Sequence, residues 1–208
     1  MEATRQPSHQ AGLGGGQIDT ADANLGESKF QGPSPNQGNQ LTAVDVKGGN
    51  SHPPIVKSLV WPTELQTRLF ACALAKQGAL RHAFIELRGD LGAGKTTLVR
   101  HLLHALGVTG HIKSPTYAVV EQYELPKLKV WHFDFYRFHD PREWEEAGFR
   151  DIFASPGLKL AEWPEKVGVY LPRADLVLHI TALVDDSRHV SLTSHTLLGE
   201  TLLHGIVQ

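Results

Sequence analysis

The chain has few of the residues that define disulfide-rich, metal-clustered or membrane proteins. Only one cysteine, Cys72, occurs among its 208 residues, which excludes an intramolecular disulfide framework and a cysteine metal cluster. We expect Cys72 to be a small core residue of a helix. No apolar run approaches the roughly 20 residues of a membrane span, and no charged-then-apolar leader opens the sequence. These absences predict a soluble, cytoplasmic protein without membrane contact.

An excess of charge of one sign is also missing. Twenty Lys and Arg residues are balanced by 22 Asp and Glu, giving a net charge of −2. This balance provides no general attraction to nucleic acid or to an anionic membrane. A dominant contact with RNA therefore has no support from net charge.

Residues 1–54 lack the apolar side chains that a core requires. Gly, Gln, Asn, Ser and Pro dominate, and Phe30 is the only aromatic residue. Such a composition cannot bury enough apolar surface to offset the entropy of ordering. We expect a disordered tail over 1–54, a P-loop domain over 55–195 and a C-terminal segment, 196–208, of uncertain structure. Acidic residues and scarce arginine disfavour a transit peptide.

The strongest functional motif has the spacing of a phosphate-binding P-loop. Gly89 is followed by four residues and then by Gly94, Lys95 and Thr96. Glycine lets the backbone turn its N–H groups toward a polyphosphate. Lys95 would direct its charge to the β- and γ-phosphates, the Thr96 hydroxyl could ligate Mg²⁺, and the following helix would point its dipole at the anion. The predicted nucleotide-binding residues of this stretch are Gly89, Asp90, Leu91, Gly92, Ala93, Gly94, Lys95, Thr96 and Thr97.

The apolar pattern around this motif predicts an α/β domain. Strands are expected over 58–61, 84–87, 117–123, 130–133, 158–161, 176–180 and 188–192. Helices are expected to start after Thr63 and at Asp140, and to lie over 98–106, over 149–153 and near 164–167. The short turn at 125–128 makes its two flanking strands antiparallel. In the first helix, Leu65, Leu69, Cys72 and Ala73 should share one face, and Gly78 should end the helix.

Two carboxylates end predicted strands, where ligands of α/β sheets bind. Asp134 follows the apolar run 130–133 and is a candidate metal-side acid, the alternative being a turn cap. Glu162 ends the strand 158–161 and could orient water, help bind metal or contact a partner, the alternative being an ordinary surface carboxylate. Thr116 lies on a loop after the P-loop helix, where its hydroxyl could sense the γ-phosphate or the metal. It could equally be ordinary turn material.

The arginines and histidines give weaker indications. Arg137, Arg142 and Arg150 follow Asp134, and one could stabilise phosphate charge, although surface arginines are more common. His101 and His104 share a helix face without a third ligand, which disfavours a zinc site.

Four motifs in the same order and spacing resemble the TsaE family of P-loop ATPases in bacterial tRNA threonylcarbamoyladenosine biosynthesis. They are residues 89–97, Lys113–Tyr117, His132–Arg137 and Glu162–Glu165. The resemblance implies a P-loop NTPase fold, with a central parallel sheet, antiparallel flanking strands and helices on both faces. It also implies ATP and Mg²⁺ as ligands.

The same resemblance assigns roles to individual residues. Lys95 and Thr96 match the Walker A positions, and Asp134 matches the Walker B acid. Thr116 matches a switch-like threonine, and Glu162 with Trp163 matches a functional Glu-Trp pair. We therefore expect Lys95, Asp134 and Glu162 to serve catalysis, with Thr96, Asp134 and Glu162 on the metal side.

The resemblance further implies TsaD and TsaB as partner proteins. TsaD, with TsaB, transfers the threonylcarbamoyl group to adenosine 37 of tRNA, and the ATPase resets that complex without forming the bond. Contact with tRNA is expected to be indirect. A small-molecule P-loop kinase is the alternative function, and a binding module without turnover is a third. A GTPase is disfavoured because the sequence has no Asn/Thr-Lys-x-Asp motif.

Overall fold

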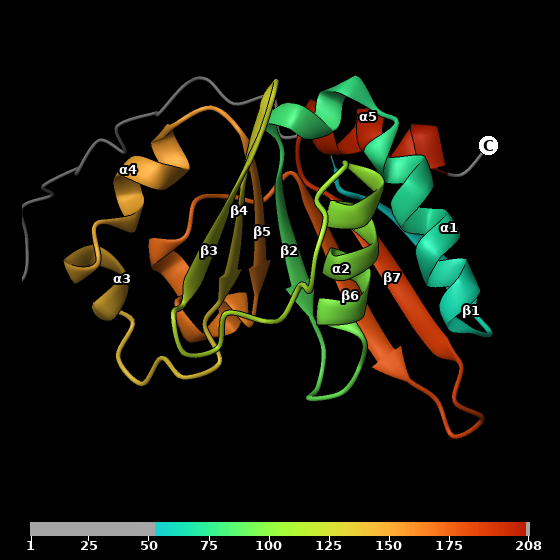
Figure 1. Ribbon diagram of the computed structural model, residues 1–208. Coiled ribbons are helices and arrows are strands. Elements are labelled where there is room, and N and C mark those ends of the chain that lie inside the picture. The colour runs from blue at the N-terminus through green and yellow to red at the C-terminus, as the bar shows by residue number, and fades with distance from the viewer. Residues whose placement is uncertain (1–52, 207–208) are drawn as a thin grey trace, which may run out of the picture. The chain divides into compact units, whose positions relative to one another are not determined.

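A seven-stranded sheet forms the centre of the computed structural model, which describes residues 53–206 (Figure 1). The predicted tail lies outside the described residues except for its last two positions. The strands are β1 (Ile55–Trp61), β2 (Phe84–Arg88), β3 (Val120–Leu125), β4 (Leu128–Asp134), β5 (Leu158–Glu162), β6 (Leu176–Ala182) and β7 (Arg188–Ser194). The helices are α1 (Glu64–Ala75), α2 (Lys95–Ala105), α3 (Glu143–Glu146), α4 (Phe149–Ala154) and α5 (Leu197–Ile206). Short 3-10 turns occupy Gly78–His82, Pro164–Lys166 and Gly168–Tyr170.

The strand order is β1-β7-β6-β2-β5-β4-β3, with a parallel centre and antiparallel edges. β2 pairs in parallel with both β5 and β6, and β4 pairs in parallel with β5. β3 pairs antiparallel with β4, and β7 pairs antiparallel with both β6 and β1. The predicted arrangement of the sheet is therefore confirmed.

Helices cover both faces of this sheet because buried side chains alternate along the strands. On one face, Ile85 and Leu87 of β2 share a core cluster with buried residues of α1, α2 and α5. On the other face, Phe84 shares a cluster with Trp144 of α3 and Phe149 of α4. In Figure 1, α2 lies in front of the sheet next to α1, and α3 and α4 lie together away from them.

The start of α1 is as predicted, but its buried face is not. The Thr63 hydroxyl accepts the Leu65 N–H at 3.3 Å, within a complete capping box. Leu65 and Leu69, expected to be buried, are 47% and 56% exposed. Phe70 packs instead against Trp61, with ring centroids 5.1 Å apart. The prediction was wrong because the neighbouring elements decide which stripe of a helix is buried.

The buried stripe also leaves Cys72 outside the core. The residues of α1 that are buried are Thr67, Phe70, Ala71 and Leu74, whereas Cys72 is half-buried. The helix ends at Ala75, and Gly78 begins a 3-10 turn rather than ending the helix.

Three further segments differ from expectation at their ends. β3 begins at Val120 rather than Tyr117, because Val119 has a φ of 66° that interrupts the extended chain. α3 begins at Glu143 with Arg142 as its N-cap, whereas Asp140 was the expected N-cap; the Asp140 carboxylate accepts the Arg142 N–H at 2.9 Å in a turn. The C-terminal segment, uncertain from sequence, contains α5. Within residues 53–206, no helix has the length and apolarity needed to cross a membrane.

The P-loop starts at a close crossing between Gly89 and β6. A Cβ atom at Gly89, which has a φ of +131°, would lie 2.1 Å from the Ile180 carbonyl oxygen. We expect Gly89→Ala to lower the free energy of unfolding by about 3 kcal/mol, through strain and the clash. Urea denaturation of the purified variant measures this loss.

Gly92 supplies the matched control within the same loop. Its φ is +80°, but no atom lies within 4 Å of the added Cβ. Gly92→Ala should therefore cost only about 1 kcal/mol, the price of the backbone conformation. Equal losses for the two variants would contradict the proposed clash.

Candidate functional site

The P-loop folds as predicted, between β2 and α2. Gly94 caps α2 with a φ of 112°, and Lys95 is the first residue of the helix. The Lys95 ammonium turns back along the loop, where its Nζ donates to the Gly89 oxygen at 2.6 Å and the Asp90 oxygen at 2.8 Å. Gly89 and Asp90 thus act through their carbonyl groups, which hold the lysine in place.

The buried position of Lys95 lowers the pKa of its side chain. The residue is only 4% exposed, and this burial lowers the pKa of its ammonium below the ordinary value. The carboxylate of Glu162 is the strongest of the acidic groups that oppose the shift. A phosphate placed beside this desolvated ammonium would interact with it more strongly than in water.

The sheet register brings the two predicted carboxylates together. Asp134 and Glu162 are direct neighbours on the parallel strands β4 and β5. Alternation along β4 places Asp134 on the same face as Val130, in the core cluster beneath α2. The Thr96 hydroxyl, at the start of α2, donates to both Glu162 carboxylate oxygens at 2.9 Å. The register therefore brings Glu162 to the first turn of α2.

Glu162 has a second partner that sequence reasoning missed. His132 is fully buried on β4, and its Nε2 lies 2.9 Å from Glu162 Oε1. Because a carboxylate only accepts, Nε2 carries the proton in this bond. Nδ1 has no hydrogen-bond partner among the described residues. A polar residue two positions before Asp134 in an apolar strand was the available signal, since such residues share a face.

Asp134 is held by groups of the loop that precedes β3. The Thr116 hydroxyl donates to Asp134 Oδ2 at 2.8 Å, and the Ser114 hydroxyl donates to the same oxygen. The Tyr136 N–H donates to the other oxygen at 2.9 Å. Ser114 was absent from the predicted site, although it belongs to the same Ser-Pro-Thr segment as Thr116.

Trp163 covers Lys95 from the end of β5. Its backbone is left-handed, with a φ of 58°, and its ring centroid lies 4.0 Å from the Lys95 Nζ. This distance is that of a cation–π contact. The Tyr136 ring lies 5.0 Å from the Trp163 ring. The two aromatic rings form a wall beside the ammonium.

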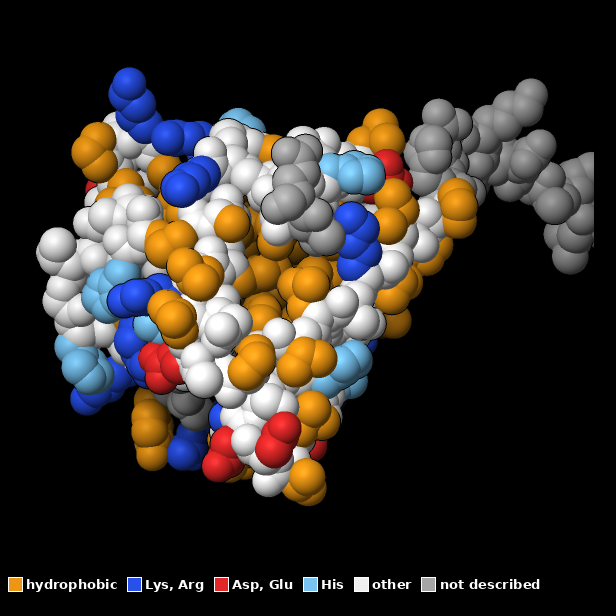
Figure 2. All heavy atoms as spheres, turned by 90° about the vertical axis from the view of Figure 1, so that its right-hand side faces the viewer, with side chains coloured by type: hydrophobic (Ala, Val, Ile, Leu, Met, Phe, Trp, Pro, Cys, Tyr) orange, Lys and Arg blue, Asp and Glu red, His pale blue; other side chains and the backbone are white. Residues whose placement is uncertain are grey.

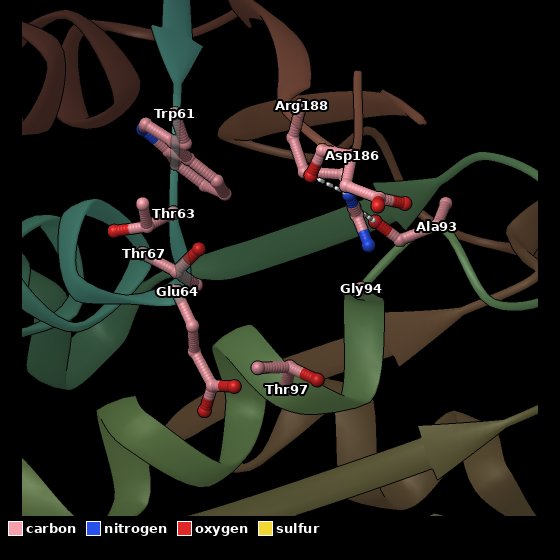
Figure 3. Close-up of a pocket in the computed structure, with 9 residues that line it drawn as sticks. All are labelled: Trp61, Thr63, Glu64, Thr67, Ala93, Gly94, Thr97, Asp186 and Arg188. Carbon is pink, nitrogen blue, oxygen red and sulfur yellow. Dashed lines mark hydrogen bonds between the residues drawn. The ribbon is translucent and has the colours of Figure 1, made fainter. Parts of the chain in front are cut away.

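These groups surround a cavity of about 250 Å³. Its lining residues are Leu91, Gly92, Gly94, Lys95, Thr96, Thr97, Ser114, Thr116, Asp134, Tyr136, Glu162 and Trp163. Of the predicted site residues, Gly89, Asp90 and Ala93 do not line it. Ala93 instead lines a second hollow of about 100 Å³ on another side of the P-loop, together with Trp61, Thr63, Glu64, Thr67, Gly94, Thr97, Asp186 and Arg188 (Figure 3).

The donor atoms around the cavity fit a magnesium ion. Thr96 offers a hydroxyl oxygen, and Asp134 and Glu162 offer carboxylate oxygens, the hard ligands that Mg²⁺ prefers. Residues 53–206 contain no group of three His, Cys, Asp or Glu side chains that could hold a metal. A site with one or two carboxylates that is completed by substrate phosphates matches this arrangement.

The remaining arginines and histidines lie elsewhere. Arg142 and Arg150 form exposed ion pairs with Asp140 and Glu145. Arg137 lies over the Tyr117 ring. His101 bonds Glu64, and His104 bonds the Val108 carbonyl, so neither pairs with the other around a metal.

Comparison with known proteins decides the family. Residues 61–190, more than half of the chain, match the family model described as "Threonylcarbamoyl adenosine biosynthesis protein TsaE". The chain belongs to the TsaE family.

Individual proteins are also similar to this chain in sequence or in structure. The tRNA threonylcarbamoyladenosine biosynthesis protein TsaE of Haemophilus influenzae is 42% identical over 134 residues, covering 64% of this chain and 84% of the relative. The protein of that name from Bacillus subtilis is 34% identical over 144 residues, covering 67% and 87%. The crystal structure of Bacillus subtilis YdiB aligns with a TM-score of 0.62 at 26% identity, covering 75% of this chain and 97% of that one.

The lowered pKa of Lys95 leads to a prediction about pH. Phosphate attraction requires the ammonium, and burial makes Lys95 lose its proton at a lower pH than an exposed lysine. Affinity for inorganic tripolyphosphate should therefore fall at a lower pH than the titration of an exposed lysine. Isothermal titration calorimetry at a series of pH values measures the fall.

Lys95→Ala provides the comparison for this titration. The variant should bind tripolyphosphate weakly at every pH, without the alkaline decline. A wild-type affinity that stays constant to about pH 10 would show that the Lys95 charge does not govern phosphate binding.

Proposed function

We propose that the protein binds and hydrolyses ATP with Mg²⁺, as the ATPase of tRNA threonylcarbamoyladenosine (position 37) biosynthesis. The observation that supports this proposal most strongly is that Thr96, Asp134 and Glu162 line the same cavity as Lys95 of the P-loop. The relatives named above bear the name of that biosynthesis. In this proposal the protein acts on the TsaB–TsaD complex and does not itself form the threonylcarbamoyl bond.

Each group around the cavity has a distinct task in this reaction. The P-loop N–H groups and Lys95 hold the phosphates and offset their charge. Thr96 and Asp134 would hold Mg²⁺, which would supply positive charge to offset that of the phosphates. Glu162 orients a water for attack on the γ-phosphorus and accepts its proton, while the bond to the β-phosphate oxygen breaks and leaves ADP. His132 fixes the position of the Glu162 carboxylate through the hydrogen bond of 2.9 Å between His132 Nε2 and Glu162 Oε1.

The loop before β3 connects the cavity to the surface of the protein, where a partner could bind. Thr116 contacts Asp134, while Tyr117, the next residue, is 85% exposed. Leu91 of the P-loop is 76% exposed as well. A change at the γ-phosphate or metal would move the hydroxyl that bonds Asp134 and shift the adjoining surface. We propose that TsaD and TsaB respond to this change.

The net charge of −2 provides no general attraction to tRNA. Figure 2 shows one side of the molecule, on which basic, acidic, histidine and hydrophobic side chains are interspersed. Phosphate-backbone binding requires clustered Lys and Arg residues. We propose that the route to tRNA runs through the partner proteins.

Two substitutions separate phosphate and metal binding from the chemical step. Asp134→Ala should abolish Mg²⁺-dependent turnover, because the metal loses a carboxylate. Glu162→Gln should bind ATP but hydrolyse it about 100-fold more slowly, because an amide accepts no proton. Binding by calorimetry and release of inorganic phosphate measure the two steps.

Glu145→Gln is the matched control, since Glu145 lies in an exposed ion pair with Arg150. It should leave binding and hydrolysis unchanged. Full turnover by Asp134→Ala, or loss of ATP binding by a folded Glu162→Gln protein, would refute the assigned roles.

The function itself is tested with labelled ATP, with and without the purified TsaB–TsaD pair. We expect release of inorganic phosphate that increases when the pair is present. Transfer of label to a small acceptor would identify a kinase instead. Binding without turnover, even with the partners, would identify a binding module.

A further inference from the structure

We propose that two copies of this chain join through β1, edge to edge and antiparallel, around a two-fold axis at Ser58. β1 is the last strand of the sheet and pairs with β7 on one side. Among residues 53–206, no strand pairs with its other side. The N–H and C=O groups of that free edge can bond a strand of a second molecule. The inference does not depend on the proposed ATPase function.

The composition of β1 favours pairing. Edge strands that resist pairing are short, bulged or charged. β1 has seven residues in unbroken register with β7, from Ile55 opposite Ser194 to Trp61 opposite Arg188. Lys57 is its single charged residue, and alternation places this lysine on the face that α1 covers. The opposite face of the strand therefore carries no charge.

That opposite face of β1 exposes two valines. Val56 and Val60 are 58% and 55% exposed. They alternate with Ile55 and Leu59, which pack against the core cluster on the α1 side of the sheet. Among the described residues, the cluster on the α3 side includes none from β1 or β7. A second strand beside β1 would remove apolar surface of both valines from water.

One antiparallel register pairs all seven residues of β1 with the same strand of a second copy. It sets Ser58 opposite Ser58 of the second copy, and Val56 opposite Val60 in both directions. A two-fold axis perpendicular to the sheet produces this register, since an isologous contact pairs residue i with j and j with i. A slip of one residue would set each valine against the other face of the strand. A slip of two residues would set Val56 against Ser58.

Helix α1 adds apolar surface to this contact. Strand pairing alone is small compared with the roughly 1,200–2,000 Å² of a stable interface. Leu65 and Leu69 are 47% and 56% exposed. They lie about 100° and 140° around the helix from Glu64, which bonds His101 of α2, so they are turned away from α2. The axis would bring α1 of both copies to the same face of the joined sheet.

The figures show that α1 and β1 occupy one side of the molecule. Both lie on the right in Figure 1, where the sheet ends. Figure 2 shows this side, with hydrophobic side chains in the centre of the view. The free edge of β1 and the exposed leucines of α1 can therefore contribute to a single interface.

The proposed contact leaves the phosphate cavity of each copy open. β7 and β6 separate β1 from β2, the strand that leads into the P-loop. The axis reverses the strand direction of the second copy, so the two cavities would lie at opposite ends of the joined sheet. Variants of β1 should therefore bind inorganic tripolyphosphate as the wild type does.

Sedimentation velocity of the full chain over a range of concentrations measures the association. We expect a species of twice the 22.9 kDa chain mass at the higher concentrations. Val56→Glu and Val60→Lys should each weaken association about 100-fold, because each sets an unpaired charge against an apolar neighbour. The double variant should restore association, since each new carboxylate then faces a new ammonium group. Circular dichroism checks that every variant is folded.

Val169→Glu is the matched control for the added charge. Val169 is 96% exposed and lies in the turn Gly168–Tyr170, away from β1 in the sequence. This variant should associate as the wild type does. Equal weakening by Val169→Glu would show that added negative charge, rather than the β1 edge, governs association.

A cysteine on the axis provides a covalent measurement. Directly opposed Cα atoms of antiparallel strands are roughly 4.5–5.5 Å apart, which is within the range of a disulfide. Ser58→Cys in a Cys72→Ser background should form a disulfide between two copies when oxidised glutathione is added. Val169→Cys in the same background should remain a single chain.

Several results would overturn the proposed contact. They are a full chain that stays monomeric at all concentrations, association that neither single variant weakens, and a double variant that does not recover it. Protection of the β1 amides from hydrogen exchange in a monomeric chain would assign the edge to another occupant. Weaker tripolyphosphate binding by the folded β1 variants would contradict the separation of the contact from the cavity.

Discussion

Parallel pairing of β2, β5 and β4 is the constraint on which the site depends. It aligns the carboxyl ends of these strands, so that the P-loop leaves β2 beside Asp134 and Glu162. A shift of β4 by one residue would turn Asp134 and His132 to the face covered by α3 and α4. The apolar residues that fix the register therefore also fix the geometry of the polar site.

The sequence predicts those parts of the site that depend on local pattern. The P-loop spacing, the strand ends at Asp134 and Glu162 and the capping box at Thr63 are all set by residues close together in the chain. These features appear in the structure where they were expected. The parallel centre of the sheet followed from the family resemblance.

Other features depend on neighbours that are distant in sequence. The buried face of α1 is determined by the position of Trp61, and the bond of Arg188 to Ala93 spans 95 positions. His132 could be recognised as a polar residue in a buried strand, but its partner Glu162 is known only from the β4–β5 register. The positive φ of Val119 has no signal in a β-branched residue.

The two carboxylates differ in the kind of structure that holds them. Glu162 is bonded to His132 of the adjoining strand, within the rigid sheet. Asp134 is bonded to hydroxyls of the loop before β3, part of which is exposed. The first arrangement suits a fixed position for a reacting water, whereas the second suits communication with the surface.

The contact between Lys95 and Trp163 has an optical consequence. An indole beside a cation emits light at a wavelength and intensity that depend on the local field. A phosphate that draws the Lys95 ammonium away from the 4.0 Å contact would alter that field. Trp61, Trp131 and Trp144 do not contact this ammonium, and they are buried within the two core clusters. The protein thus carries, at the edge of its phosphate cavity, a fluorophore that reports on the charge beside it.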